Sequence, residues 1–392
     1  MNQEKIVIVD GARTAIGSFG GMFKDVPGFE LGAVATKEAL RRAGVETEAV
    51  DEVVMGCIGQ VGADAYNARR VAITAGLPKA VPAYTVNRLC GSGLQAVWSA
   101  AMQMRWGGVD IAVAGGNESM TRMPFYDFGA RSGYKLGNRE LVDGTVMMLT
   151  DPFGGTHMGV TAENVANRWG VTRAEQDEFA AESQRRAASP QAEAAFIEEI
   201  APVEVGGRKP FIASVDEHPK PATTVETLAG LRPAFTPGGT VTAGNSSGIN
   251  DGGAALVLAR EEVAADRGLE ALVSLEAVTT AAMEPELMGY APVLALRSLF
   301  EQTGTSPQDI GIIELNEAFA AQAVACIRDA KLDPEQVNPY GGAIALGHPV
   351  GATGANLTLR VAKDMVRRDL ELGIVTMCIG GGQALAALFR RV

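Results

Sequence analysis

The chain has 392 residues, of which 47% are hydrophobic and 20% are charged, and its formal net charge is −12 at pH 7. This composition supports a large buried core and excludes a largely disordered chain. The acidic excess disfavours nucleic acid as a partner, because nucleic-acid-binding surfaces are basic. We find neither a signal-peptide pattern before the first strand nor an apolar run near the ~20 residues that span a membrane, so we expect a cytoplasmic protein without membrane attachment.

Hydrophobic periodicity predicts short apolar strands that alternate with helices, beginning with a strand at residue 6. The predicted helices are those through Leu31, Val34 and Ala35 before Gly44, through Leu94, Val97, Trp98 and Ala101, and through Leu357, Val361 and Met365 after Gly354. Short apolar runs between such helices predict an α/β protein with buried, mostly parallel strands.

Residues 120 to about 250 break this alternation with clusters of Met, Gly and Pro. They contain one clear helical stretch, Arg173 to Ala188, which ends before Pro190. We interpret residues 120–244 as an inserted loop domain, a setting in which ligand contacts are common. One half of the protein then comprises residues 1–119 and 245–270, and the other half comprises residues 271–392.

The two halves resemble each other in the order of their apolar runs and turns. Four segments match in order: 6–17 with 272–283, 51–57 with 309–316, 86–87 with 337–338, and 110–116 with 372–381. Weak matches in the same order indicate an internal duplication. The duplication places a glycine-rich turn at 341–354 opposite the one at 87–93.

The four cysteines, Cys57, Cys90, Cys326 and Cys378, lie far apart without a CxxC pair. This spacing argues against a disulfide framework and against a zinc site, so we expect no metal. Cys57 and Cys326 lie in apolar runs and are interpreted as small buried residues.

Cys90 follows the strand-like segment 84–87 and precedes Gly91-Ser-Gly93, which opens a helix. A thiol at a helix N-terminus faces the positive end of the helix dipole and unpaired N–H groups, and both favour the reactive thiolate. The glycines permit a sharp turn and close approach of a substrate. The alternative is a packing cysteine beside a structural turn.

His348 lies on the second glycine-rich turn, again before a helix. An imidazole has the pKa needed to take the proton of a thiol nucleophile, and the duplication places this one opposite Cys90. The alternative is a lone histidine whose ring is satisfied by backbone groups.

Cys378 ends the last apolar run and precedes Ile379-Gly-Gly-Gly382. Its thiol suits proton transfer at carbon, and the neighbouring glycine N–H groups suit an oxyanion. The alternative is a small packing residue at a strand end. Asn316 either orients a water or a carbonyl oxygen, or caps the helix that follows it.

Taken together, seven segments resemble the thiolase family along essentially the whole chain. They are 87–93 (Asn-Arg-Leu-Cys-Gly-Ser-Gly), 115–120, 157–164, 243–252, 316–319 (Asn-Glu-Ala-Phe), 347–349 (Gly-His-Pro) and 378–382. The resemblance implies a five-layered αβαβα fold with the two halves packed face to face and a loop domain that covers coenzyme A. It also implies the thiolysis of 3-ketoacyl-CoA by coenzyme A and the reverse condensation of two acetyl-CoA molecules to acetoacetyl-CoA, with ping-pong kinetics.

The same resemblance assigns roles to the residues. Cys90 would take the acyl group as a thioester. His348 would activate Cys90 and, together with a water held by Asn316, would stabilise a thioester oxygen. Cys378 would exchange a proton with the α-carbon of the second acyl-CoA. The backbone N–H groups of Cys90 and Gly380 would form a second oxyanion hole.

Coenzyme A and acyl-CoA would bind as substrates, and no tightly bound cofactor is implied. The implied binding residues are His157, Lys220, Ala243, Ser247, Met288, Ala318 and Phe319. Met288 and Phe319 would line the acyl pocket. The local basic residues that could bind the phosphates of coenzyme A are Arg208, Lys209, Lys220 and Arg232. The alternative is that they are solvated charges of surface loops.

His157, Met158 and Met288 resemble those of the short-chain members that are specific for acetoacetyl-CoA, although the segment from Met288 to Val293 also resembles broader degradative members. The related ketoacyl synthases typically lack the segment Cys378-Ile-Gly-Gly-Gly382, so its presence argues against that family. A third alternative is a non-catalytic acyl-CoA-binding protein on the same fold. Because the family is usually dimeric or tetrameric, we expect a homo-oligomer.

Overall fold

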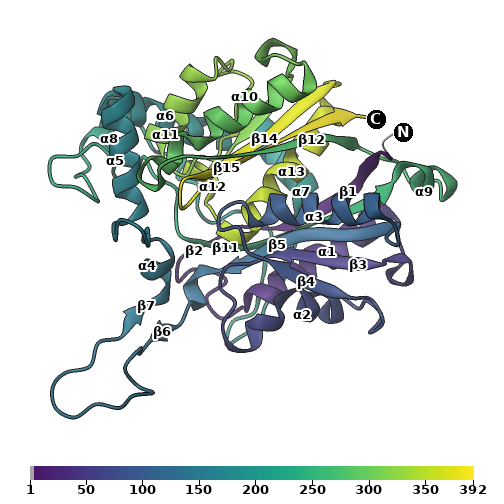
Figure 1. The fold of residues 1–392 in the computed structure, drawn as a ribbon, viewed down its shortest axis with the longest axis horizontal. Helices are drawn as coiled ribbons and strands as arrows, with labels where there is room; N and C mark the ends of the chain where they lie inside the picture. Colours follow the sequence, from purple (N-terminus) through teal and green to yellow (C-terminus); the bar gives the residue numbers. More distant parts are fainter. Residues whose placement is uncertain (1–3) are drawn as a thin grey trace.

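The computed structural model describes residues 4–392 and consists of two similar halves with a lateral insertion (Figure 1). The N-terminal half contains β1 (Ile6–Thr14), β2 (Gly17–Ser18), α1 (Gly28–Ala43), β3 (Glu52–Gly56), α2 (Asn67–Thr74), β4 (Ala83–Val86), α3 (Ser92–Trp106), β5 (Ile111–Ser119), β11 (Asn250–Arg260) and α9 (Glu261–Asp266). The C-terminal half contains β12 (Val273–Ala282), η4 (Pro285–Tyr290), α10 (Ala291–Thr303), β13 (Ile312–Leu315), α11 (Ala320–Asp329), α12 (Ala343–Leu346), α13 (Val350–Arg367), β14 (Leu372–Ile379) and β15 (Gln383–Arg391).

The strand pairings of the two halves match, which confirms the internal duplication. β3 pairs with β5 in parallel as β13 pairs with β14, and β11 lies between β5 and β1 as β15 lies between β14 and β12. Val86 pairs with Gly56 in parallel, and Val337 forms the equivalent parallel bridge to Ile313. The predicted matches 6–17 with 272–283 and 110–116 with 372–381 therefore correspond to equivalent strands.

The expectation of mostly parallel strands is wrong. β11 is antiparallel to both β1 and β5, and β15 is antiparallel to both β12 and β14. The tight turn Gly380–Gly382 explains the second case, because so short a connection joins only antiparallel neighbours. Periodicity marks such strands as buried, but it does not give their direction.

The elements form five layers. α1 and α2 cover the outer face of the N-terminal strands, and α10 covers the outer face of the C-terminal strands. α3 and α13 pack against each other between the two sets of strands, where Leu94, Leu357 and Val375 belong to one buried core. The two sets join through the short antiparallel pairing of β1 with β12.

The insertion holds more helices than the sequence predicted. It contains β6 (Phe125–Tyr126), β7 (Val142–Asp143), α4 (Gly144–Met148), α5 (Met158–Trp169), α6 (Arg173–Ala187), α7 (Pro190–Glu199), β8 (Ile200–Ala201), β9 (Val203–Val205), β10 (Phe211–Ala213) and α8 (Val225–Ala229). Only α6 was predicted, and it ends before Pro190 as expected. Pro190 then begins α7, because proline is well suited to the first helical turn. The segment between β6 and β7 extends away from the body (Figure 1). Within residues 4–392, no helix is both long and apolar enough to cross a membrane.

Candidate active site

The N-termini of α3 and α13 meet in the middle layer because glycines line their contact. A Cβ atom on Gly93 would lie 2.7 Å from the backbone nitrogen of Ala355, and one on Gly354 would collide with the start of α3. Larger residues would therefore hold the helices apart. Cys90 lies just before α3 and His348 just before α13, so this contact brings together the two turns that carry these side chains.

Cys90 is half-buried and follows a residue with an unusual backbone conformation. Leu89 has a φ of 48°, in the left-handed region that residues with a side chain rarely adopt. Burial raises the pKa of the Cys90 thiol to about 11, although hydrogen bonds from the backbone N–H groups of Gly380 and of Cys90 itself oppose that rise. The sequence-based expectation of a favoured thiolate is therefore wrong for the resting protein, because desolvation outweighs the N–H groups.

His348 is buried and held in one tautomer. The Thr353 hydroxyl donates to the Pro349 carbonyl (3.1 Å), so it accepts from Nδ1–H of His348 (2.7 Å). This assignment leaves Nε2 with its lone pair free to accept a proton. Burial lowers the pKa of His348 to about 4, which keeps the ring neutral at pH 7. The backbone N–H of His348 donates to Asn250 Oδ1 (2.9 Å) and fixes the turn.

Asn316 follows β13 and faces the same imidazole. Its Nδ2 lies 3.4 Å from His348 Nε2. Among the described residues, its buried Oδ1 has no hydrogen-bond partner. An unpaired buried acceptor beside an imidazole nitrogen suits a water or another polar group that donates to it. Asn316 is not the cap of the next helix, because α11 begins only at Ala320.

Cys378 is the second-to-last residue of β14, directly before the glycine turn whose Gly380 N–H group reaches Cys90. Burial raises the pKa of the Cys378 thiol well above its usual value, and the charge of a Cys90 thiolate raises it further. The two thiols are thus close enough to influence each other. A thiol with so high a pKa becomes a strong base when it loses its proton, as abstraction of a proton from carbon requires.

Several of the predicted ligand residues contact the segment that follows Asn316 or lie on it. Ser247 donates its backbone N–H to the carbonyl of Ala318 (3.0 Å). Phe319 meets Phe235 edge to face at 6.1 Å between ring centroids, and Phe235 stacks on His157 at 4.8 Å. These ring contacts therefore connect the inserted loop domain with the segment that carries Asn316.

Met288 is buried, whereas the predicted basic residues are exposed. Met288 is buried in the same core as Phe319 and Cys378. Ala243 and Lys220 are exposed, and Lys220 is fixed through its backbone N–H to Gln184 Oε1 (2.8 Å). Arg208, Lys209 and Arg232 are also exposed side chains of the insertion. Among residues 4–392, no hydrogen bond or ion pair joins these basic side chains to Cys90 or Cys378.

Sequence reasoning missed three partners of the site: Thr353, Asn250 and Phe235. Thr353 lies five residues after His348, in α13, so its closeness was visible in the sequence. Asn250 and Phe235 come from distant segments, and their contacts depend on the tertiary fold.

Comparison with known proteins finds family models and relatives that match almost the whole chain. The family model "Thiolase, N-terminal domain" matches residues 6–262, and "Thiolase, C-terminal domain" matches residues 269–391. The acetyl-CoA acetyltransferase of Cupriavidus necator is 44% identical over 98% of this chain and 99% of its own length. Beta-ketothiolase BktB of the same organism is 46% identical over 99% of both chains.

Solved structures give the same result. The acetyl-CoA acetyltransferase of Bacillus anthracis superimposes with a TM-score of 0.98 at 41% identity and covers 100% of this chain and 99% of its own. The human mitochondrial 3-ketoacyl-CoA thiolase in complex with CoA gives a TM-score of 0.96 at 37% identity, covering 100% of this chain and 98% of its own.

Proposed function

The chain belongs to the thiolase family, and from this premise we propose how its residues cleave 3-ketoacyl-CoA with coenzyme A and condense two acetyl-CoA molecules in reverse. It is an acyltransferase. The observation that carries the mechanism is the meeting of Cys90, the Asn316–His348 pair and the Cys378 turn where α3 and α13 touch.

In the first half-reaction of thiolysis, His348 Nε2 takes the proton of the Cys90 thiol as sulfur attacks the 3-keto carbonyl. The N–H groups of Cys90 and Gly380 stabilise the oxyanion that forms, since both already point at this sulfur. The carbon–carbon bond then breaks. Cys378 gives its proton to the α-carbon, and acetyl-CoA leaves while the acyl group stays on Cys90 as a thioester.

The thioester oxygen of the departing acetyl-CoA carries negative charge while its α-carbon is unprotonated. A water on Asn316 Oδ1, together with the imidazole, would hold that oxygen. In the second half-reaction, the thiol of coenzyme A gives its proton to the Cys378 thiolate and attacks the acyl-enzyme. Cys90 leaves as a thiol by taking back the proton from His348. The acyl-CoA released is two carbons shorter than the 3-ketoacyl-CoA, and the kinetics are ping-pong.

Coenzyme A and acyl-CoA are the substrates in this scheme, without a tightly bound cofactor or metal. His157, Ser247, Ala318 and Phe319 would contact the pantetheine arm, and Ala243 would border it. Lys220, with Arg208, Lys209 and Arg232, supplies positive charge for the phosphates. Met288 and Phe319 would limit the acyl chain, and we favour a short-chain enzyme, with a broader 3-ketoacyl-CoA thiolase of fatty-acid breakdown as the second candidate.

The test is thiolysis of acetoacetyl-CoA, 3-ketohexanoyl-CoA and 3-ketodecanoyl-CoA, followed by the loss of 3-ketoacyl-CoA absorbance. Activity confined to acetoacetyl-CoA supports the short-chain enzyme. Comparable rates on the longer chains support the broader thiolase. Inactivity on all three substrates would contradict the proposed reaction and favour a non-catalytic acyl-CoA-binding protein.

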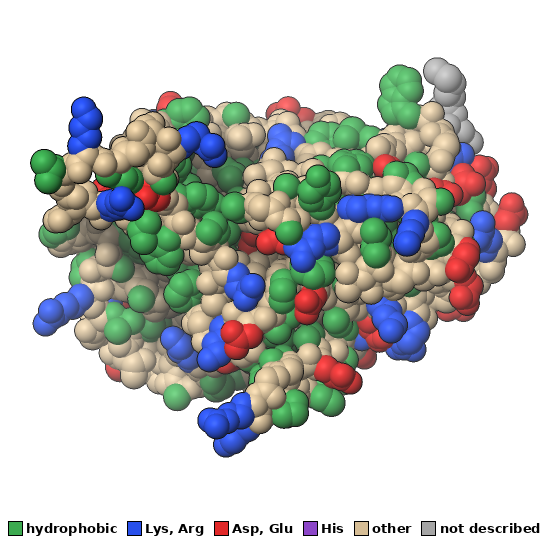
Figure 2. Space-filling view, turned by 90° about the horizontal axis from the view of Figure 1, so that it is seen from below, with side chains coloured by type: hydrophobic (Ala, Val, Ile, Leu, Met, Phe, Trp, Pro, Cys, Tyr) green, Lys and Arg blue, Asp and Glu red, His purple; other side chains and the backbone are tan. Residues whose placement is uncertain are grey.

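We further propose a cytoplasmic homo-oligomer, a dimer or a tetramer. All four cysteines are free thiols, which is typical of a reducing compartment. The protruding segment between β6 and β7 exposes Phe128, Leu136 and Leu141, and large exposed apolar side chains commonly mark protein contacts. Figure 2 shows the molecule from below relative to Figure 1. Hydrophobic side chains lie at this surface between Lys and Arg residues. Light scattering of the purified protein tests this: a monomer would contradict it, and the measured mass separates dimer from tetramer.

A further inference from the structure

The segment Pro285–Tyr290 (η4), which carries Met288, lies between the Cys378 turn and helix α11. On one side, the carbonyl of Gly382 accepts the backbone N–H of Met283 (2.7 Å). A Cβ atom on Gly382 would also lie 3.0 Å from the nitrogen of Pro285. The start of the segment is therefore fixed against the turn that follows Cys378.

On the other side, one polar stripe of α11 holds the segment. Gln322, Cys326 and Asp329 follow the i, i+4, i+7 spacing that places residues on one helix face. Cys326 Sγ donates to the carbonyl of Gly289 (3.3 Å), and Tyr290 Oη donates to Asp329 Oδ2 (2.8 Å).

The third residue of the stripe acts through close packing. A Cβ atom on Gly289 would lie 2.9 Å from Gln322 Cβ, so the segment approaches α11 as closely as a glycine allows. The side-chain amide of Gln322 is oriented so that its nitrogen donates to the carbonyl oxygens of Asn316 and Phe319, each at 3.3 Å. The same stripe thus contacts both the Met288 segment and the segment that carries Asn316.

These contacts matter because the segment has little regular structure of its own. Leu287 has non-helical angles (φ −117°, ψ 19°), so the backbone is kinked one residue before Met288. The position of such a segment depends on what it packs against. Trp169, stacked on Tyr290 at 3.8 Å, supports it from α5.

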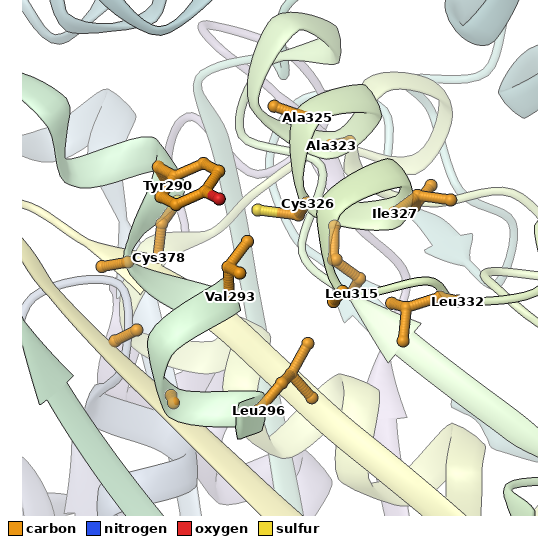
Figure 3. Close-up of a cluster of buried hydrophobic side chains, with 14 of the residues drawn as sticks. Tyr290, Val293, Leu296, Leu315, Ala323, Ala325, Cys326, Ile327, Leu332 and Cys378 are labelled. Carbon is orange, nitrogen blue, oxygen red and sulfur yellow. The ribbon is translucent and has the colours of Figure 1, made fainter. Parts of the chain in front are cut away.

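We propose that the α11 stripe, and Cys326 in particular, sets the acyl-chain length that the enzyme accepts by fixing Met288 relative to Cys378. Cys326 is a positioning residue, since it acts through Gly289. Figure 3 shows its sulfur pointing toward Tyr290 and Val293, while Ile327 points to the other side of α11. Removal of the sulfur leaves space between Gly289 and α11. Met288 then moves toward α11, and the acyl pocket that it lines becomes wider. This inference rests on the proposed thiolase activity and deepens it.

The experiment compares kcat/KM for 3-ketohexanoyl-CoA with kcat/KM for acetoacetyl-CoA in the full-length protein. One methylene group in an apolar pocket changes kcat/KM by roughly 10–200-fold, so partial relief in Cys326→Ala should raise the ratio by about fivefold. Cys326→Ser keeps a donor for the Gly289 carbonyl and should return the ratio toward that of the unaltered enzyme. Ile327→Val also removes one buried atom from α11, on its other face, and should leave the ratio unchanged.

An unchanged ratio in folded Cys326→Ala, or an equal change in Ile327→Val, would overturn the inference. If Cys326→Ala does not fold, Tyr290→Phe carries the same test, because it removes only the hydrogen bond to Asp329 and should raise the ratio in the same direction. Failure of the unaltered enzyme on all 3-ketoacyl-CoA substrates would instead refute the proposed function itself. The two failures are therefore distinguishable.

Discussion

The two glycine-rich turns before α3 and α13 occupy equivalent positions in the two halves, yet they carry different chemistry. The N-terminal turn presents a half-exposed thiol after a residue in the left-handed region. The C-terminal turn carries a buried imidazole held through Thr353 and Asn250. The duplicated backbone brings two helix N-termini together, and the side chain placed on each decides whether that half supplies the nucleophile or the base.

The largest expected effect comes from removal of the nucleophile. Cys90→Ala leaves the sulfur position empty and should lower the rate of thiolysis by about 10⁴-fold or more, because the residue is part of a unit that acts together. Incubation with acetyl-CoA followed by intact-mass measurement should show no acyl-enzyme. Full turnover by this variant would rule out the assignment of Cys90.

Cys378→Ala separates the carbon acid–base step from acyl transfer. Cys90 and His348 remain, so the acyl-enzyme should form from acetyl-CoA at a near-normal rate, because acylation by acetyl-CoA needs no proton transfer at carbon. Thiolysis of acetoacetyl-CoA should fall by about 10³-fold, within the range for loss of a general acid or base. Intact mass reports the first step, and loss of absorbance reports the second. Loss of acylation itself would contradict the role of Cys378.

The helix contact that aligns the two turns can be tested by adding one carbon. In Gly354→Ala, the new Cβ would lie 2.9 Å from Leu94 Cβ and 3.0 Å from the carbonyl carbon of Gly93. Overpacking of this kind should lower the free energy of unfolding by about 1–3 kcal/mol and separate Cys90 from His348. Denaturant unfolding and acylation rate measure the two effects.

Gly206→Ala is the matched control, because a Cβ atom there would meet no atom within 4 Å. Its free energy of unfolding should change by less than about 0.5 kcal/mol. If Gly354→Ala were as stable and as active as this control, close packing of α3 against α13 would not be what aligns the site.

Much of the fold and site could be predicted from the sequence because chemistry and glycines coincide in short motifs. Cys90, Asn316 and Cys378 lie where a strand meets a turn, and His348 lies on the turn between α12 and α13. The direction of β11 and β15 could not be predicted, since buried strands of either direction have the same apolar pattern. Helix α5 was missed because its apolar face is short and its N-terminus is capped by His157.

The resting state of the thiol could not be predicted from position alone. A helix N-terminus favours thiolate, but the balance depends on how much water the folded protein removes from the sulfur. That quantity is a property of the packed site, where burial raises the pKa of Cys90 and lowers that of His348.

These two pKa shifts predict the smallest effect, a nearly flat pH profile. His348, with a pKa of about 4, stays neutral and able to accept a proton at any pH above that value, whereas an ordinary histidine would begin to protonate near pH 6.5. Cys90, with a pKa of about 11, stays a thiol at any pH below that value. The rate of Cys90 acylation by acetyl-CoA should therefore change by less than about twofold between pH 6 and 9.

Glu118 is a buried group whose titration would interrupt that plateau. Burial raises the pKa of its carboxyl to about 7, and its charge raises the pKa of Cys90. A small change in acylation rate near pH 7 that disappears in Glu118→Gln would belong to this carboxyl. A decrease below pH 6.5 that persists in Glu118→Gln would mean that His348 titrates like an exposed histidine, and the contrast between a buried base and a half-exposed nucleophile would no longer hold.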